Sequence, residues 1–119
     1  MDYMLIYRET AEEVGQRDDP ERAPAYWGAW HAYMGSIAAA GIMKAGAGLE
    51  PPRAATTVRL QGGQRQVQDG PYADTREHLG GFVILDVASL DEALEWAARA
   101  PCAARGSVEV RPVLPPPAR

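Results

Sequence analysis

The sequence predicts an α+β fold in which two β-α-β units share one antiparallel sheet, with both helices on one face. Strand-like and helix-like segments follow one another in the order β-α-β, β-hairpin, β-α-β. Both helical segments carry start or stop signals. The stretch GGFVILDV, residues 80–87, is apolar on both of its faces, which is typical of a central strand. The hairpin is therefore expected as an insertion into a split β-α-β pair.

The first unit begins with a strand at residues 3–8, YMLIYR, rich in aromatic and aliphatic side chains. Residues 9–24 are polar and turn-rich and are predicted as a loop. Asp19-Pro20 and Ala23-Pro24 each offer a helix start, because Pro is tolerated at the first helical position. The helix should run to about residue 40, where Gly41 supplies the stop.

This helix carries almost no charge: residues 23–43 contain no Asp, Glu, Lys or Arg. Bulky side chains gather on one face of its wheel, small ones gather on another, and His31 lies at the border of the bulky face. The bulky face is Trp27, Trp30, Met34, Ile37 and Ala38, and the small face is Gly28, Ala32, Gly35 and Ala39. We infer that the helix contacts a second subunit or an enclosed cavity besides its own sheet. The segment is long enough to span a bilayer, but its Pro, His, Ser and glycines favour a globular helix.

The rest of the chain supplies the hairpin and the second unit. Ser89 and Glu92 are spaced as a capping box, and Pro101 closes the helix that follows them. Gly80-Gly81 is expected to permit a close backbone approach before the central strand. The predicted segments are a short strand at 42–52, hairpin strands at 55–60 and 64–68, a helix at 90–100 and a final strand at 107–113. We assign residues 1–114 to a single domain and 115–119 to a Pro-rich tail.

Composition excludes several classes of protein. The chain has 119 residues, a net charge of -4 and a pI near 5.1, which argue against nucleic acid as a partner. A single cysteine, Cys102, fits a reducing compartment, and the acidic start lacks the basic region of a signal peptide, so we expect a cytoplasmic protein. Because there is no phosphate-binding glycine loop and the two histidines are far apart, we expect no cofactor and no metal.

The second face of the sheet needs a cover, because the two helices lie on the first. Sheet-to-sheet dimerisation is the simplest solution, so we expect a homodimer. Glu109 and Arg111 lie two residues apart on one side of the last strand. They are expected to form an ion pair across the dimer or to line the cavity.

The candidate catalytic residues are His31, Asp69 and Asp74. An imidazole that titrates near neutral pH suits a general base, and either carboxylate could orient it or the substrate. Each also has a structural interpretation: His31 as a core or interface histidine, Asp69 as the cap of a turn, and Asp74 with Glu77 as the capping box of a short helical turn. We expect a small organic ligand in a cavity between the first helix and the sheet. The residues predicted to bind it are Tyr7, Trp27, Trp30, Met34 and Tyr72.

Four stretches of the chain form a recognisable set: GIMKAGAGLEPP, ATTVRL, VQDGPYADTREHLGGFVILDVASLDEALEWAAR and GSVEVRPV. Through these stretches, residues 2–113 resemble the YCII-related proteins, in particular their DGPF-motif branch. The motif reads Asp69-Gly70-Pro71-Tyr72, with Tyr in the place of Phe. The resemblance implies a ferredoxin-like α+β fold that dimerises through its sheets, like the dimeric α/β-barrel proteins.

The family implies function less directly. Some YCII-like members act as lyases on small aromatic or chlorinated rings, and DGPF members often occur beside extracytoplasmic-function sigma factors. The family pattern pairs a His on the first helix, here His31, with an Asp in an Asp-Pro step, which here reads Ala100-Pro101. The leading hypothesis is a cofactor-independent acid–base enzyme of isomerase, cyclase or lyase type. The alternative is a non-catalytic binding or signalling module linked to sigma-factor regulation; oxygenase-like chemistry rests on fold analogy alone.

Overall fold

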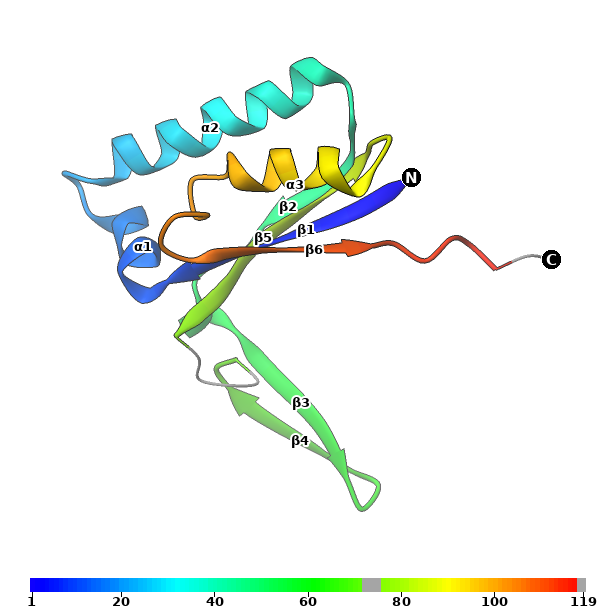
Figure 1. Ribbon diagram of the computed structural model, residues 1–119. Helices are drawn as coiled ribbons and strands as arrows, with labels where there is room; N and C mark the ends of the chain where they lie inside the picture. The colour runs from blue at the N-terminus through cyan, green and yellow to red at the C-terminus, as the bar shows by residue number, and fades with distance from the viewer. Residues whose placement is uncertain (72–75, 118–119) are drawn as a thin grey trace.

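The computed structural model describes residues 1–71 and 76–117 and shows a four-stranded antiparallel sheet with two long helices on one face (Figure 1). The strand order in this sheet is β2-β5-β1-β6. The strands are β1 (Asp2–Thr10), β2 (Met43–Gly48), β3 (Thr56–Gln61), β4 (Gln64–Asp69), β5 (Glu77–Asp86) and β6 (Ser107–Pro112). The helices are α1 (Ala11–Gly15), α2 (Ala23–Ala40) and α3 (Leu90–Ala98), with 3₁₀ turns η1 (Gln16–Asp18) and η2 (Pro52–Ala54).

The two β-α-β units interleave. Both β2 and β1 pair antiparallel with β5, and β6 pairs antiparallel with β1, so each unit has a strand of the other between its own two strands. The strands β3 and β4 pair only with each other and form the inserted hairpin. The predicted α+β class and antiparallel sheet are confirmed.

Alternation along β1 separates the two faces of the sheet. Tyr3, Leu5, Tyr7 and Glu9 are buried beneath the helices, while the side chains between them are half-buried on the opposite face. The core between sheet and helices consists of Tyr3, Leu5, Tyr7, Tyr33, Ile37, Val83, Leu85, Val87, Ala93, Ala97, Ala100 and Cys102. Glu9 is the one position in this alternation where a charged group is buried in place of an apolar one.

The predicted loop at residues 9–24 is wrong over its first half. The strand β1 continues to Thr10, whose side chain then caps α1 in a reciprocal capping box with Glu13. A 3₁₀ turn, η1, follows and carries Arg17. The capping box satisfies backbone donors that a loop would leave to water, and it turns the chain back over the end of the sheet.

The limits of α2 agree with the sequence, but its buried face is rotated from the predicted one. Tyr26, Tyr33 and Ile37 are buried, whereas Trp27 is 41% exposed and Ala38 is exposed. Tyrosines can face the sheet because their hydroxyls find partners there, as described below. The helix stops at Gly41, which adopts φ 70, as its position predicts. Within residues 1–71 and 76–117, no helix is long and apolar enough to cross a membrane.

Two further expectations are corrected at the sheet. Glu77 is not part of a helical turn: it begins β5 and accepts a hydrogen bond from the Ser107 hydroxyl at 2.5 Å. Glu109 already has partners within its own chain, because Arg8 binds it at 2.8 Å and Arg111 binds its other oxygen. These partners lie on the face of the sheet opposite the helices, where antiparallel pairing sets Arg8 and Glu109 on neighbouring strands.

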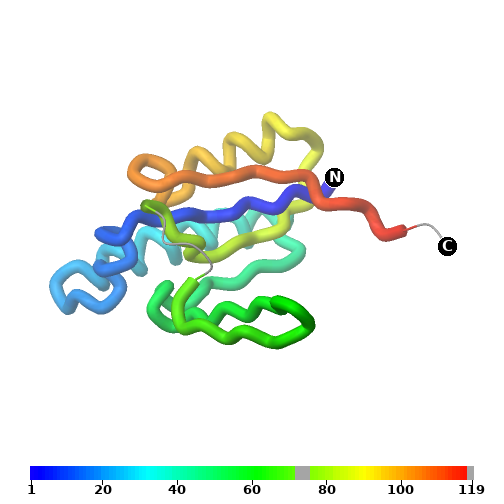
Figure 2. Tube along the Cα trace, turned by 90° about the horizontal axis from the view of Figure 1, so that it is seen from below, coloured from blue at the N-terminus to red at the C-terminus, as the bar shows by residue number. Residues whose placement is uncertain are grey.

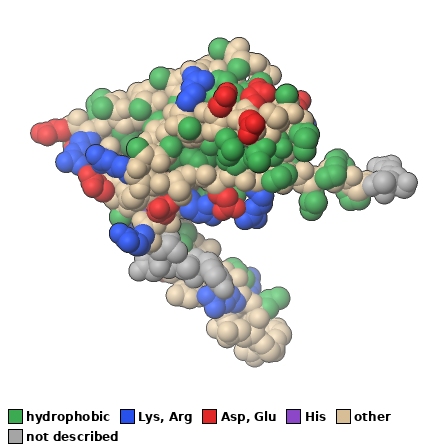
Figure 3. Space-filling view, in the orientation of Figure 1, with side chains coloured by type: hydrophobic (Ala, Val, Ile, Leu, Met, Phe, Trp, Pro, Cys, Tyr) green, Lys and Arg blue, Asp and Glu red, His purple; other side chains and the backbone are tan. Residues whose placement is uncertain are grey.

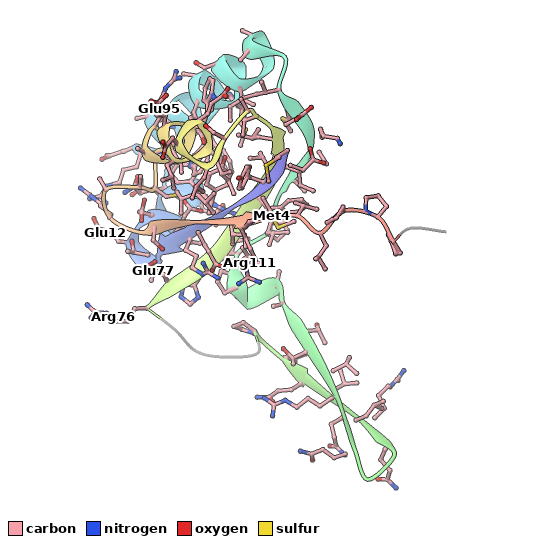
Figure 4. The ribbon with its side chains drawn as sticks, turned by 45° about the vertical axis from the view of Figure 1, so that its right-hand side comes forward. Met4, Glu12, Arg76, Glu77, Glu95 and Arg111 are labelled. Atoms are coloured by element: carbon pink, nitrogen blue, oxygen red, sulfur yellow. The ribbon has the colours of Figure 1, made fainter. Side chains whose placement is uncertain are left out.

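That opposite face has no helix over it among the described residues. Figure 2, seen from below, shows the long helices behind the strands. Figure 4 shows Met4 and Arg111 on the sheet near the root of the hairpin, and Figure 3 shows basic and acidic side chains together below β6. The apolar residues of this face are the half-buried Met4, Ile6, Phe82 and Ile84. We call them the open-face cluster.

The hairpin projects on the open side of the sheet (Figure 1). Val58 and Val67 face each other across it and are 56% and 55% exposed, and Leu60 is 75% exposed. The radius of gyration is 16.3 Å, against about 13–14 Å for a compact domain of this length. The exposure of these side chains, with the pairing of β3 and β4 to each other, makes the hairpin an arm that adds little to the core.

Candidate functional site

A pocket of about 510 Å³ lies between α2 and the end of the sheet where β1, β2 and β5 meet η1. Aromatic side chains form much of its wall, and a small group of charged residues closes its inner end. The lining residues named below are Tyr7, Glu9, Arg17, Tyr26, Trp27, Trp30, His31, Met34, Glu50, Arg53 and Gly80. This volume lies in the range of small-molecule sites in proteins.

A buried cluster of Glu9, Arg17 and Tyr26 closes the inner end of the pocket. The Arg17 guanidinium donates from Nη2 to Oε1 of Glu9 at 2.7 Å and from Nε to the Tyr26 hydroxyl at 2.9 Å. That hydroxyl donates in turn to Oε2 of Glu9 at 2.5 Å. The side chains of Glu9 and Arg17 are only 1% and 9% exposed. Each of the three side chains is therefore hydrogen-bonded to the other two, and the opposite charges of Glu9 and Arg17 neutralise one another away from water.

Burial and hydrogen bonding fix the protonation states of this cluster. Burial alone would lower the pKa of Arg17, but its hydrogen bonds to Tyr26 and Glu9 outweigh burial and raise the pKa above its ordinary value. Burial, with the hydrogen bond to Glu9, raises the pKa of Tyr26. Arg17 is therefore charged and Tyr26 is a neutral phenol at neutral pH.

Arg17 also ties three elements together through the backbone. Its Nη1 donates to the Leu49 carbonyl at 2.5 Å, and Nη2 lies 3.4 Å from the Gly80 carbonyl. Its guanidinium lies 5.6 Å from the centre of the Trp27 ring, within cation–π range. Leu49 follows β2 and Gly80 lies in β5, so one side chain from η1 links these two segments at the inner end of the pocket.

Gly80 makes room for the cluster. Tyr7 pairs with Gly81 and Arg8 with Leu79, which leaves Gly80 as an extra residue, a β-bulge. A Cβ placed on Gly80 would lie 2.5 Å from Oε1 of Glu9 and 3.2 Å from Nη2 of Arg17. The close approach predicted for Gly80-Gly81 is found here, and at Gly81 it is to the backbone of Ala47.

Replacing Gly80 with Ala should therefore lower the free energy of unfolding by about 1–3 kcal/mol, the usual cost of overpacking. Gly28→Ala is the matched control, because Gly28 lies inside α2 with nothing within 4 Å of the added Cβ. That control should stabilise the protein by about 0.5–1 kcal/mol through helix propensity. Urea denaturation followed by circular dichroism measures both. A Gly80→Ala variant as stable as wild type would contradict the close packing of Gly80 against Glu9 and Arg17.

An aromatic group forms the wall between the cluster and the core. Tyr7 and Trp30 meet edge to face with ring centres 5.1 Å apart, and Tyr33 lies 5.9 Å from each. The Tyr33 hydroxyl donates to the Trp96 carbonyl at 3.0 Å, so the Tyr7 hydroxyl, 2.9 Å away, is the donor to Tyr33. Burial raises the pKa of Tyr33 to about 12. These phenols are structural hydrogen-bond donors at neutral pH.

The structure brings together some of the predicted site residues and leaves others apart. Tyr7, Trp27, Trp30, His31 and Met34 all line the pocket, with His31 exposed at its outer part. Asp69 does not: it is exposed at the end of β4, paired with Thr56 in the hairpin. Tyr72 and Asp74 lie outside the described residues. The acids that line the pocket are Glu9, Asp18 and Glu50, and Glu9, the buried one, lies in the segment that the sequence analysis predicted as a loop.

Cys102 does not line this pocket, and a second hollow of the surface adjoins it through Leu49, Glu50 and Pro51, which line both. Cys102 is fully buried, and burial raises the pKa of its thiol to about 12, so it is unreactive in the folded protein. The second hollow, of about 610 Å³, between Arg8, His78 and the root of the hairpin, lies on the open side of the sheet. Among the described residues, no three His, Cys, Asp or Glu gather as metal ligands.

Comparison with known families identifies the chain. A model of the YCII-related domain matches residues 1–116, so the chain belongs to this family. An uncharacterized protein of Rhizobium meliloti (strain 1021), R00369, is 49% identical over 67 residues, which cover 55% of this chain and 54% of the relative. The match thus spans about half the length of that relative.

Among solved structures, the fold is similar to that of 5-chloro-2-hydroxyhydroquinone dehydrochlorinase from Burkholderia phenoliruptrix AC1100, in a complex with 2,5-dihydroxybenzoquinone. The TM-score is 0.55, the sequence identity is 16%, and the match covers 96% of this chain and 94% of the other. At this identity the likeness concerns the fold alone.

Proposed function

We propose that this member of the YCII-related family binds a small planar ring compound that bears oxygen substituents, and acts on it by acid–base chemistry without a cofactor. The observation that carries the proposal is the pocket of about 510 Å³, with aromatic walls and an imidazole at its outer part. Flat aromatic walls favour a flat ligand, and the imidazole supplies a base near neutral pH. The dehydrochlorinase with the similar fold, whose complex holds a quinone, supports this class of ligand.

In this proposal each side chain has a defined task. His31 takes a proton from a ring hydroxyl or ring carbon of the ligand, and reaches it through the open side of the pocket. Trp27, Trp30 and Met34 hold the ring by stacking and by apolar contact. The Glu9–Arg17–Tyr26 cluster fixes the inner end of the pocket. In isomerisation or cyclisation the imidazolium returns the proton to another atom of the ligand, and in elimination the leaving group departs with the electron pair of its bond to the ring as the proton is removed.

The open-face cluster supports the proposal of a homodimer. Met4, Ile6, Phe82 and Ile84 form an apolar patch on an uncovered sheet face, and the hairpin adds Val58, Leu60 and Val67 on the same side. A second copy, facing the first, would bury both surfaces at the spacing of about 10 Å that stacked sheets adopt. We also place the chain in the DGPF branch, on Asp69-Gly70-Pro71-Tyr72.

Hydroquinone serves as the probe of the proposed function, and isothermal titration calorimetry in anaerobic buffer measures its binding. His31→Gln should leave its dissociation constant within about threefold of the wild-type value, because His31 lies at the exposed part of the pocket. Trp30→Leu should weaken binding by about tenfold, because one aromatic contact is lost.

Once a substrate is known, His31→Gln should lower kcat by about 10²–10⁴-fold, the usual contribution of a general base. Ser36→Ala, on the same helix and outside the pocket lining, is the control. Unchanged turnover by a folded His31→Gln variant would remove His31 from the mechanism.

A non-catalytic binding or signalling module, such as a partner in sigma-factor regulation, is the second candidate. Position 100, where the family pattern has an acid, holds Ala, and this Ala is buried in the core. In addition, the buried carboxylate of the pocket lining, Glu9, is engaged on both oxygens by Arg17 and Tyr26. A ligand that binds stoichiometrically and is recovered unchanged, with His31→Gln indistinguishable from wild type, would favour this candidate.

A further inference from the structure

We propose that the pocket selects uncharged ring ligands against analogues that carry a carboxylate, and that Glu9 sets this preference by occupying Arg17. This inference rests on the proposed function, since it names the charge class of the ligand that the same pocket takes. It assigns Glu9 and Arg17 a role in specificity that differs from a direct contact with the ligand.

Arginine is the side chain best suited to hold a carboxylate, because its N–H groups form a fork that matches the two oxygens. In this pocket the fork is already filled. Arg17 donates to Glu9, to the Tyr26 hydroxyl and to the carbonyls of Leu49 and Gly80. Four contacts on a side chain that is 9% exposed leave no pair of donors for a ligand carboxylate.

The other charges around the pocket also disfavour an anion. Arg53 is paired with Asp18 at 2.8 Å, so these two lining residues cancel. Glu50 also lines the pocket, and among the described residues no salt bridge joins it to a cation. Among the Asp, Glu, Lys and Arg residues of the lining, the acidic side chains therefore outnumber the basic ones by one, on a chain whose net charge is -4. A carboxylate entering it would lose water and gain no counter-ion, which is the costly case of ion burial.

Uncharged hydroxyls and carbonyls do not meet this penalty. The indole N–H of Trp30, on the pocket wall, has no hydrogen-bond acceptor within residues 1–71 and 76–117, and His31 offers a donor or an acceptor according to its tautomer. These groups suit a neutral ring with oxygen substituents.

A matched pair of probes tests the inference: hydroquinone, and 2,5-dihydroxybenzoate, which is the same ring with a carboxylate added. Calorimetry at pH 7.5 should show that the wild-type protein binds hydroquinone at least about tenfold more tightly than 2,5-dihydroxybenzoate. Glu9→Gln removes the negative charge and keeps one carbonyl oxygen as acceptor, while its NH2 group replaces the second acceptor oxygen. The ratio of the two dissociation constants should shift by about tenfold in favour of 2,5-dihydroxybenzoate, because the Arg17 charge is then available to the ligand carboxylate.

Two further variants keep the test decisive. Glu50→Gln changes an exposed pocket residue and should tighten 2,5-dihydroxybenzoate by about two- to threefold, with hydroquinone unchanged. Glu12→Gln removes an exposed carboxylate that pairs with Arg105 outside the pocket, and should change neither. Circular dichroism establishes that each variant is folded; the wild-type comparison and Glu50→Gln remain informative if Glu9→Gln does not fold.

The outcomes separate this inference from the proposed function. Equal or tighter wild-type binding of 2,5-dihydroxybenzoate overturns the charge selection while leaving a ring-binding pocket in place. A folded Glu9→Gln variant with the wild-type preference overturns the role of Glu9. If neither probe binds the wild-type protein, or if Trp30→Leu leaves the binding of hydroquinone unchanged, the result counts against the proposed function itself.

Discussion

Arg17→Met should lower the free energy of unfolding by about 3–5 kcal/mol, the cost of leaving one partner of a buried ion pair without its counter-charge. Met keeps most of the aliphatic length of Arg, so the loss reports on the guanidinium. Glu9, 1% exposed, would then face only the Tyr26 hydroxyl. Urea denaturation of the purified variant, followed by circular dichroism, measures the change.

Arg53→Met is the control for this prediction. Its salt bridge to Asp18 has a similar length, 2.8 Å, but the two side chains are 73% and 67% exposed, so the variant should lose less than about 1 kcal/mol. The triple variant Glu9→Leu/Arg17→Met/Tyr26→Phe should recover most of the stability, because apolar side chains need no counter-charge and leave no buried hydroxyl without its partners. An Arg17→Met variant within about 1 kcal/mol of wild type would show that the buried pair contributes little.

Phe82→Glu should convert the proposed homodimer into a monomer. Phe82 belongs to the open-face cluster and pairs with Ile6 across β5 and β1, so a carboxylate there would be buried between two like sheets. Analytical ultracentrifugation at about micromolar concentration measures the change in mass, expected as a loss of at least about 100-fold in dimer affinity. Leu94→Glu, on the exposed side of α3, is the matched control and should leave the dimer intact. A wild-type chain that sediments as a monomer at this concentration would contradict the proposed assembly.

The order and kind of the main elements could be predicted because their signals are local. The apolar run at residues 80–87, the Ser89 cap and the stop at Gly41 each depend on a few neighbouring residues, and the structure has β5, α3 and the end of α2 at these places. The short helix α1 was missed although Thr10 and Glu13 have capping-box spacing. The polar composition of residues 9–24 concealed that signal.

The pocket could be predicted only in part. Its aromatic wall comes from the bulky side chains of α2, which helical periodicity brings to one side, and so Trp27, Trp30 and Met34 line it. The rotation of that helix could not be predicted, because it depends on the partners that the Tyr26 and Tyr33 hydroxyls find on other elements. The predicted bulky face of the helix therefore contained Trp27 and Trp30 and neither tyrosine.

The charged end of the pocket shows why sequence proximity misled. Glu9 continues the odd-numbered buried series of β1, and that alternation could have placed it beneath the helices. Arg17 carries no such signal, because its partners come from β1, α2, β2 and β5. Asp69 was chosen because it begins the recognisable motif, but Asp69 lies at the end of β4 in the hairpin and does not line the pocket.

The hairpin begins and ends at the same point of the molecule. The Gly70 amide donates to the Ala55 carbonyl at 2.7 Å, and the Thr57 hydroxyl donates to the Gly70 carbonyl at 2.8 Å. Whatever lies beyond this junction can be lengthened, shortened or exchanged without moving the ends that hold it. The turn at Gly62-Gly63 is thus a site for inserting a reporter peptide or an epitope. The insert would be displayed at the tip of the hairpin, far from the strands that build the pocket.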